Sequence, residues 1–209
     1  IRQGAIGAVR SIEVRWLEHW GGIFAAHPWL SGPKDSYLGS WVAGGGASLE
    51  HSHGVSLWNL VAKESGAGKV IEVGASINYV RDVDLYYDEY FVIDLKTENG
   101  VHGSVTQDVD TQPPEKFLEV QGDKGIIEWR ACVGGKFDEV VLKPLNQDAS
   151  VKKMPWTRPG DFEPEIAHIA RRLEGDRNAS PISLENGYET MRIIQAAHLA
   201  HSDKTRIDP

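Results

Sequence analysis

The chain has 209 residues, of which 41% are hydrophobic and 25% are charged, a composition typical of an ordinary globular protein. Its formal net charge of −8 argues against a nucleic-acid partner, since proteins that bind phosphate backbones carry clustered Lys and Arg. The single cysteine, Cys132, cannot form an internal disulfide, no apolar run is long enough to cross a membrane, and no signal peptide opens the chain. We therefore expect a cytoplasmic protein with one domain over residues 1–209 and no membrane partner.

The first part of the chain predicts a strand followed by a long loop. Residues 6–18 alternate apolar and polar side chains, which is the pattern of a half-buried strand. Residues 20–41 contain several Gly, Pro and Asp turn signals among aromatic side chains. Because binding residues concentrate on loops held by a scaffold, we expect this loop to form one wall of a ligand site, with Trp29, Asp35 and Tyr37 as candidate contacts.

The most informative stretch covers residues 44–53, where three glycines lead into one carboxylate and two imidazoles. Consecutive glycines cost backbone entropy, so they are kept where a chain turns tightly or lets another group approach. A helix is predicted over residues 52–63, and Glu50 and His53 would share one of its faces if its first turn began at the glutamate. Glu50 and His53 are therefore candidate catalytic residues, and His51 is a further candidate substrate contact.

Two other interpretations of this motif stay open. Glu50 can merely complement the helix dipole, and the histidines can be surface or capping residues. The pair His51 and His53 also resembles the first half of a cupin metal motif. The chain continues into a helical pattern, however, on which the two rings would diverge, and we predict no metal site.

The middle of the chain carries a succession of strand signals and predicts an antiparallel meander. The predicted strands cover residues 70–80, 86–97, 101–109, 117–121, 126–130 and 140–142. Asn99-Gly100 stands between two of them and is a strong hairpin signal. Because these strands alternate in polarity, we expect one apolar, covered face and one open face.

Two helices are predicted to close the chain. The first follows apolar residues at helical spacing and ends at Gly175; these residues are Phe162, Ile166, Ile169, Ala170 and Leu173. The second is expected to begin after Ser183 as its N-cap. Its expected buried stripe consists of Leu184, Tyr188, Met191, Ile194 and Ala197 or His198. His168 and His198 are expected at the edge of the core.

No Gly-x-Gly-x-x-Gly turn, Walker A sequence or Gly-x-Ser-x-Gly elbow occurs, so the chain by itself carries an incomplete chemistry. Three stretches nevertheless resemble, in order and spacing, the C-terminal domain of the Gfo/Idh/MocA oxidoreductases. They are the glycine-rich motif of residues 44–53, the paired strands and turn of residues 98–125, and the opening of the last helix at residues 181–190. The resemblance covers nearly the whole chain.

This resemblance implies an α/β fold with one open, mostly antiparallel sheet and helices packed on one face. Family members bind NAD or NADP in an N-terminal Rossmann domain, which this chain lacks, and transfer hydride between the nicotinamide and a carbinol carbon of a sugar, inositol or related polyol. The chain would then be the substrate-binding and oligomerising half of such an enzyme, inactive alone. His53 would hold the place of the catalytic histidine and Glu50 that of a carboxylate orienting the substrate or the histidine.

The resemblance also implies a homodimer or homotetramer assembled through the open sheet face, where we expect apolar residues such as Val105 and Val120. A second interpretation is a non-catalytic carbohydrate-binding or assembly module derived from the same family. Ser56 favours it, because many relatives have an aspartate at this position, and so does the absence of the lysine that the family carries in its nucleotide domain.

Overall fold

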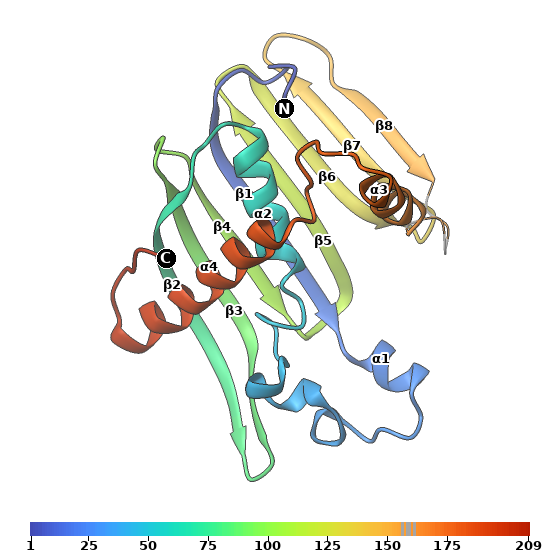
Figure 1. Cartoon of the computed structure of the whole chain (residues 1–209), viewed down its shortest axis with the longest axis vertical. Helices are drawn as coiled ribbons and strands as arrows, with labels where there is room; N and C mark the ends of the chain where they lie inside the picture. Colours follow the sequence, from blue (N-terminus) through green and yellow to red (C-terminus); the bar gives the residue numbers. More distant parts are fainter. Residues whose placement is uncertain (156, 158–159, 161) are drawn as a thin grey trace.

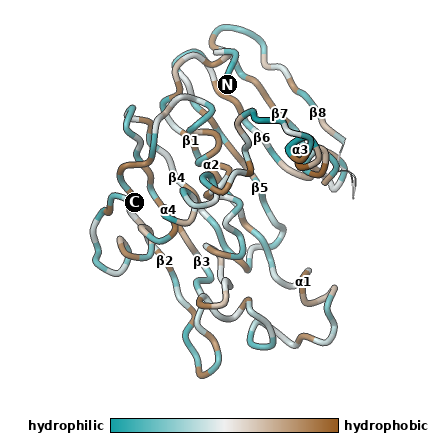
Figure 2. Tube along the Cα trace, viewed as in Figure 1, coloured by the Kyte–Doolittle hydropathy of each residue, from teal (hydrophilic) through white to brown (hydrophobic). Residues whose placement is uncertain are grey.

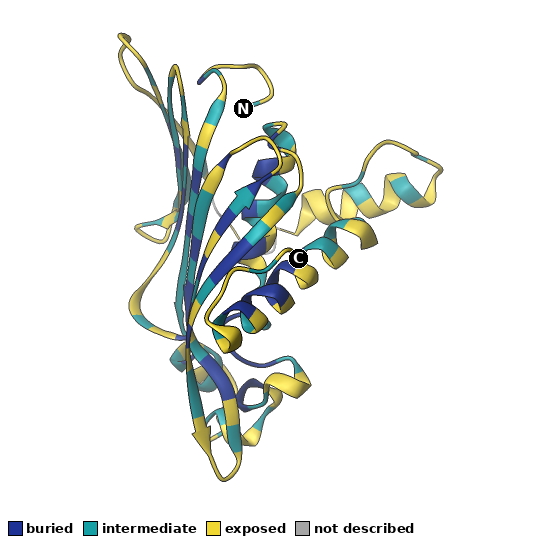
Figure 3. Ribbon diagram, turned by 90° about the vertical axis from the view of Figure 1, so that its left-hand side faces the viewer, coloured by how far each residue is buried: buried dark blue, intermediate teal, exposed yellow. Residues whose placement is uncertain are grey.

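In the computed structural model, the described residues form an open eight-stranded sheet with helices on one face (Figures 1 and 3). The structure describes residues 1–155, 157, 160 and 162–209. The strands are β1 (Val9–His19), β2 (Val70–Asp82), β3 (Leu85–Thr97), β4 (His102–Asp108), β5 (Asp110–Gly122), β6 (Gly125–Val133), β7 (Phe137–Pro144) and β8 (Ser150–Pro155). The helices are α1 (Gly21–Ala26), α2 (His53–Glu64), α3 (Glu163–Leu173) and α4 (Leu184–Asp203). Three short 3-10 turns lie between α1 and α2: η1 (Pro33–Asp35), η2 (Tyr37–Gly39) and η3 (Trp41–Ala43).

The sheet is mostly antiparallel, as the sequence predicts, but its strand order is β2-β3-β4-β1-β5-β6-β7-β8. The expected meander is therefore divided, because β1 lies between β4 and β5 and runs parallel to β4. The Asn99-Gly100 hairpin is confirmed: Gly100 has φ +79°, and the Thr97 N–H donates to the Val101 carbonyl at 3.0 Å. The edge strand β8 was not predicted. Its side chains are almost all exposed, so no apolar alternation marks it.

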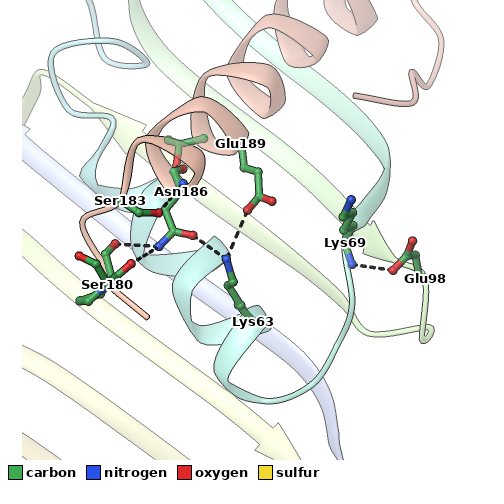
Figure 4. A network of polar contacts seen from close by, with 9 residues as sticks. Lys63, Lys69, Glu98, Ser180, Ser183, Asn186 and Glu189 are labelled. Atoms are coloured by element: carbon green, nitrogen blue, oxygen red, sulfur yellow. Dashed lines mark hydrogen bonds and ion pairs between the residues drawn. The ribbon is translucent and has the colours of Figure 1, made fainter. Parts of the chain in front are cut away.

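Two helices, α2 and α4, cover the strands β1 to β4, as Figure 1 shows. Trp58 of α2 is fully buried and donates from Nε1 to the Ile12 carbonyl of β1 at 2.9 Å. Gly103 of β4 makes room for it, since a Cβ there would lie 2.5 Å from Trp58 Nε1. Lys63 near the end of α2 donates to Asn186 Oδ1 of α4 at 2.7 Å and thus ties the two helices together (Figure 4).

Two valines lie on the opposite face of the sheet from the one expected. Val105 lies opposite Val14, Val120 lies opposite Ile12, and both valines are completely buried. Gln107, two residues beyond Val105 and so on the same face, bonds to the backbone at the start of α2. The expectation that Val105 and Val120 lie on the open face is therefore wrong: both face the helices.

The uncovered face instead carries charged and aromatic side chains. Arg15 pairs with Glu13 at 2.6 Å and with Glu115 at 2.9 Å, and its guanidinium lies 4.2 Å from the centre of the Phe117 ring. Arg130 of β6 lies over the same ring at 5.1 Å. This face is thus a charged ladder around one aromatic ring rather than an apolar patch.

Both C-terminal helices form where predicted, and the Ser183 side chain caps α4 by accepting from the Asn186 N–H. The predicted buried stripe of α4 is only half right. Ile194 and Ala197 are buried, whereas Leu184, Tyr188 and Met191 are exposed. The first half of α4 makes polar contacts with α2, through Lys63 to Asn186 and Glu189. The apolar residues of α3, visible as brown segments in Figure 2, are likewise exposed; Ile166, Ile169 and Leu173 are 64%, 43% and 84% accessible.

Candidate functional site

The glycines of residues 44–46 make a tight turn against β3. Gly44 and Gly46 have φ near +96° and +95°, a left-handed conformation that favours glycine. A Cβ on Gly46 would lie 2.2 Å from Asp88 Oδ1, so only glycine lets the chain approach this carboxylate. The Ala47 N–H then donates to the Asp88 carbonyl at 2.7 Å, and the Ser48 N–H to Asp88 Oδ2 at 2.6 Å. The motif is thereby fixed to β3.

The start of α2 is held by one buried amide from the sheet. Gln107 accepts from the Val55 N–H at 3.0 Å and donates from Nε2 to the Ala47 carbonyl at 2.7 Å. It therefore satisfies a backbone donor that the first turn of a helix leaves open. The helix begins at His53, so Glu50 lies in the turn before it, and the condition under which both residues would share a helix face is not met.

Glu50 is paired with His51 rather than with His53. The distance from His51 Nδ1 to Glu50 Oε2 is 2.8 Å, and that to Glu18 Oε2 of β1 is 3.6 Å. Lys116 of β5 forms an ion pair with the other oxygen of Glu18. Burial by itself would raise the pKa of Glu50, but His51, Trp20 and the charge of His53 together outweigh it and hold this pKa below its usual value. Glu50 is thus an ionised, half-buried acceptor.

His53 is an exposed residue at the first position of α2. Its ring centre lies 5.5 Å from that of Trp16, and Lys116 Nζ lies 4.6 Å from the Trp16 ring centre. Partial loss of water against these neighbours lowers the pKa of His53, and His51 and Lys116 lower it further. The carboxylates of Glu18 and Glu50 oppose this shift without reversing it. The ring is therefore neutral near pH 7 and able to accept a proton.

Buried polar atoms without a hydrogen bond gather around the motif. Among the described residues, such atoms are Trp16 Nε1, Trp20 Nε1, Glu50 Oε2, His51 Nε2 and Asp88 Oδ1. The Glu50 oxygen is close to His51 but lacks hydrogen-bond geometry. Buried polar groups are normally paired, so these atoms are exceptions, and they lie in or around residues 44–53.

The loop residues predicted to contact substrate lie at different depths. His51 is buried, with 2% of its surface accessible, and forms part of the interior of the site. Tyr37 is exposed, and its pKa is raised first by partial burial and then by the charge of Glu50, which places it near the motif. Trp29 and Asp35 make their described contacts within the loop, with His27 and the Ser31 N–H. Their proposed role therefore stays a prediction.

Sequence reasoning missed the strand residues of the site. Trp16 and Glu18 follow the buried residues Ile12 and Val14 at intervals of two along β1, so all four side chains lie on the face that the helices cover. This alternation in the sequence could have identified them. Lys116 lies directly opposite Trp16. Within the described chain, no group of three or more His, Cys, Asp or Glu side chains could hold a metal ion. No helix in the same part of the chain is both long and apolar enough to cross a membrane.

The model of the GFO/IDH/MocA C-terminal domain matches residues 1–128. Similar solved structures include aldose-aldose oxidoreductase from Caulobacter crescentus complexed with glycerol, which is 16% identical with a TM-score of 0.74 over 100% of this chain. Levoglucosan dehydrogenase in complex with NADH and levoglucosan is 19% identical (TM-score 0.74, 99% of this chain). An Agrobacterium radiobacter oxidoreductase in complex with NAD+, L-tartaric acid and magnesium is 17% identical (TM-score 0.73, 99%). The chain spans 58%, 60% and 58% of these proteins. No curated protein sequence matches it.

Proposed function

We propose, because the chain belongs to the GFO/IDH/MocA family, that it is the substrate-binding half of an NAD(P)-dependent oxidoreductase. The whole enzyme would transfer hydride between the nicotinamide and a carbinol carbon of a sugar, inositol or related polyol. The ligands of the similar structures support this substrate class, since glycerol, levoglucosan and L-tartaric acid all carry secondary hydroxyl groups.

The observation that carries the proposal is the accessible, neutral ring of His53 beside an ionised Glu50. When a carbinol is oxidised, its hydroxyl proton must leave, and the neutral imidazole of the exposed His53 can take it. Glu50, ionised at neutral pH, is suited to accept a hydrogen bond from a neighbouring substrate hydroxyl. His51 holds Glu50 in place, and Glu18 holds Lys116 over the Trp16 ring.

The described residues do not fit the pyrophosphate of a dinucleotide. The Val55 N–H at the start of α2 is already bonded to Gln107, and the carboxylates of Glu50 and Glu18 make this end of the helix unfavourable for phosphate. We therefore assign NAD or NADP to a separate N-terminal nucleotide domain, and derive only proton handling and substrate contacts from this chain.

The second candidate is a non-catalytic module that binds carbohydrate or assembles. The observation favouring it is that His51, at the centre of the motif, is enclosed by carboxylates and so serves packing. Ser56, which is exposed on α2, supplies no carboxylate to the site. The two candidates differ in turnover. An enzyme with its nucleotide domain turns over substrate and loses that activity when His53 is removed, whereas a non-catalytic module only binds its ligand, with or without His53.

The test is His53→Ala in the enzyme that includes the nucleotide domain. Loss of one positioned acid–base group should lower turnover by about 10²- to 10⁴-fold, with a smaller change in the substrate Michaelis constant. The rate of oxidation by the unmodified enzyme should also fall as the pH drops below the ordinary pKa of histidine, because the His53 ring becomes protonated. The variant should lack this decline in rate at acidic pH. His102→Ala, on the open face of β4, is the matched control. Near-normal turnover in His53→Ala would show that a group other than His53 accepts the proton.

We also propose that the protein is cytoplasmic and that copies of the chain pair through the uncovered sheet face, as a homodimer or homotetramer. The face is broad, and Phe117 lies at its centre between two guanidinium groups. Charged ladders of this kind can pair with a rotated copy of themselves, since the same patch serves both partners in a two-fold interface.

A further inference from the structure

A cavity lies between the C-terminal half of α4, the β2–β3 hairpin and η3. Its volume is about 810 Å³, within the range of small-molecule sites. Neither Glu50, His51 nor His53 lines it. Its described lining consists of Trp41, Val42, Leu49, Tyr79, Arg81, Tyr86, Met191, Ile194, Gln195, His198, Leu199, His201, Ser202 and Lys204.

Three aromatic rings form one wall of this cavity. The rings of Tyr79 and Tyr86 lie 5.8 Å apart, and Trp41 meets Tyr86 edge-on at 6.0 Å. Trp41 and Tyr86 are 43% and 39% accessible, so each still offers ring surface to a ligand. Large aromatic side chains bury much area at little entropy cost, and three together favour a planar, apolar partner.

The aromatic wall is fixed from behind by a chain of hydrogen bonds. The Tyr79 hydroxyl lies 2.6 Å from His198 Nδ1, and His198 Nε2 lies 3.0 Å from Ser48 Oγ. Burial lowers the pKa of His198 to about 4, so its ring is neutral and can accept from Tyr79 while donating to Ser48. Ser48 is itself anchored to Asp88. Tyr79 is therefore held in position before any ligand arrives, which favours binding.

The polar groups left for a ligand are mainly cationic. Tyr79 and His198 are already bonded to each other, and His201 Nδ1 accepts from the Ile77 N–H. Gln195 and Ser202 are neutral groups at the rim. Arg81 and Lys204 carry positive charge. The Arg81 guanidinium lies 5.0 Å from the Tyr86 ring centre and donates from Nη2 to the Tyr86 hydroxyl at 3.3 Å, which leaves its other N–H groups for a ligand.

None of the described residues that line this cavity is an acid, in a chain whose net charge is −8. A sugar would need several neutral hydrogen-bonding groups, whereas an anion needs the two cations that are present. We propose that this cavity binds a small organic anion with an aromatic body, an aryl carboxylate or aryl sulfonate.

The test titrates the 209-residue chain with 8-anilinonaphthalene-1-sulfonate, whose fluorescence rises on binding. We expect saturable binding of one molecule per chain, displaced by naphthalene-2-carboxylate. Arg81→Gln and Lys204→Gln should each weaken binding by about 5- to 10-fold, the effect of losing one partly exposed charge-assisted contact. Lys152→Gln on β8, which removes the same charge from an exposed site elsewhere, should leave binding unchanged.

A neutral analogue, N-phenyl-1-naphthylamine, separates charge recognition from simple apolar adsorption. We expect it to bind at least tenfold more weakly than the sulfonate. Equal binding of the two probes would show an apolar docking surface and overturn the proposal. So would unchanged affinity in both Arg81→Gln and Lys204→Gln, or the absence of saturable binding. Unfolding curves in urea check that each variant remains folded, because partly folded chains also bind this dye.

Discussion

Replacing Asp88 by asparagine should change how the stability of the chain depends on pH. Asp88 is completely buried, its Oδ2 accepts from the Ser48 N–H, and its Oδ1 has no hydrogen-bond partner. Burial raises the pKa of Asp88 from its ordinary 3.8 to about 6. The folded protein therefore resists ionisation of a group that the unfolded chain ionises readily.

The sign and size of the effect follow from this shift. Well below pH 3.8 the carboxyl is protonated in both states, and it imposes no ionisation cost. As pH rises through 3.8 to about 6, the unfolded chain releases the proton first, so stability is lost. A pKa raised by roughly two units lowers the free energy of unfolding by about 3 kcal/mol above pH 6. At about pH 4.5 this destabilisation is only about 1 kcal/mol.

The assay is urea unfolding of the 209-residue chain and of Asp88→Asn at about pH 7.5 and about pH 4.5. The wild type should gain about 2 kcal/mol relative to the variant as pH falls between these values. Only the change with pH is used, because the amide also alters hydrogen bonding. His198 titrates in both proteins and cancels, and Asp94→Asn, on the exposed face of the same strand, controls for the lost charge. Parallel stability curves, or a relative loss by the wild type, would refute the reasoning.

Two further predictions concern the cofactor and the sheet face. The 209-residue chain should show no binding of NAD or NADP in calorimetry, because it lacks a glycine-rich phosphate turn and because Glu50 and Glu18 lie near the start of α2. Micromolar binding would contradict the two-domain proposal. Sedimentation at micromolar concentration should show a dimer that Thr106→Glu, on the open face beside Arg15, disrupts and that the distant Lys152→Gln does not. A monomer before mutation, or a dimer that Thr106→Glu leaves intact, would contradict pairing through this face.

The elements of this fold were predictable where the chain repeats a clear period. The alternation of residues 6–18, the Asn99-Gly100 turn and the Ser183 cap are local signals, and β1, the β3–β4 hairpin and α4 form where they indicate. The exposed strand β8 lacks such a period, since a strand at a sheet edge has no buried face to impose one. The predicted stripe of α4 is partly wrong for a related reason: helical spacing shows which residues share a face, but not which of them another element covers.

What the sequence determined by itself was the local chemistry of the site: a glycine turn that only glycine can make, a carboxylate and two imidazoles behind it, and a helix after them. Only the tertiary structure decided which groups meet. The insertion of β1 between β4 and β5 brings Trp16, Glu18 and Lys116 to the motif. Gln107 accepts from the Val55 N–H in the first turn of α2, which begins at His53 rather than at Glu50. Pairing between strands distant in sequence depends on non-local burial and register, which no local pattern encodes.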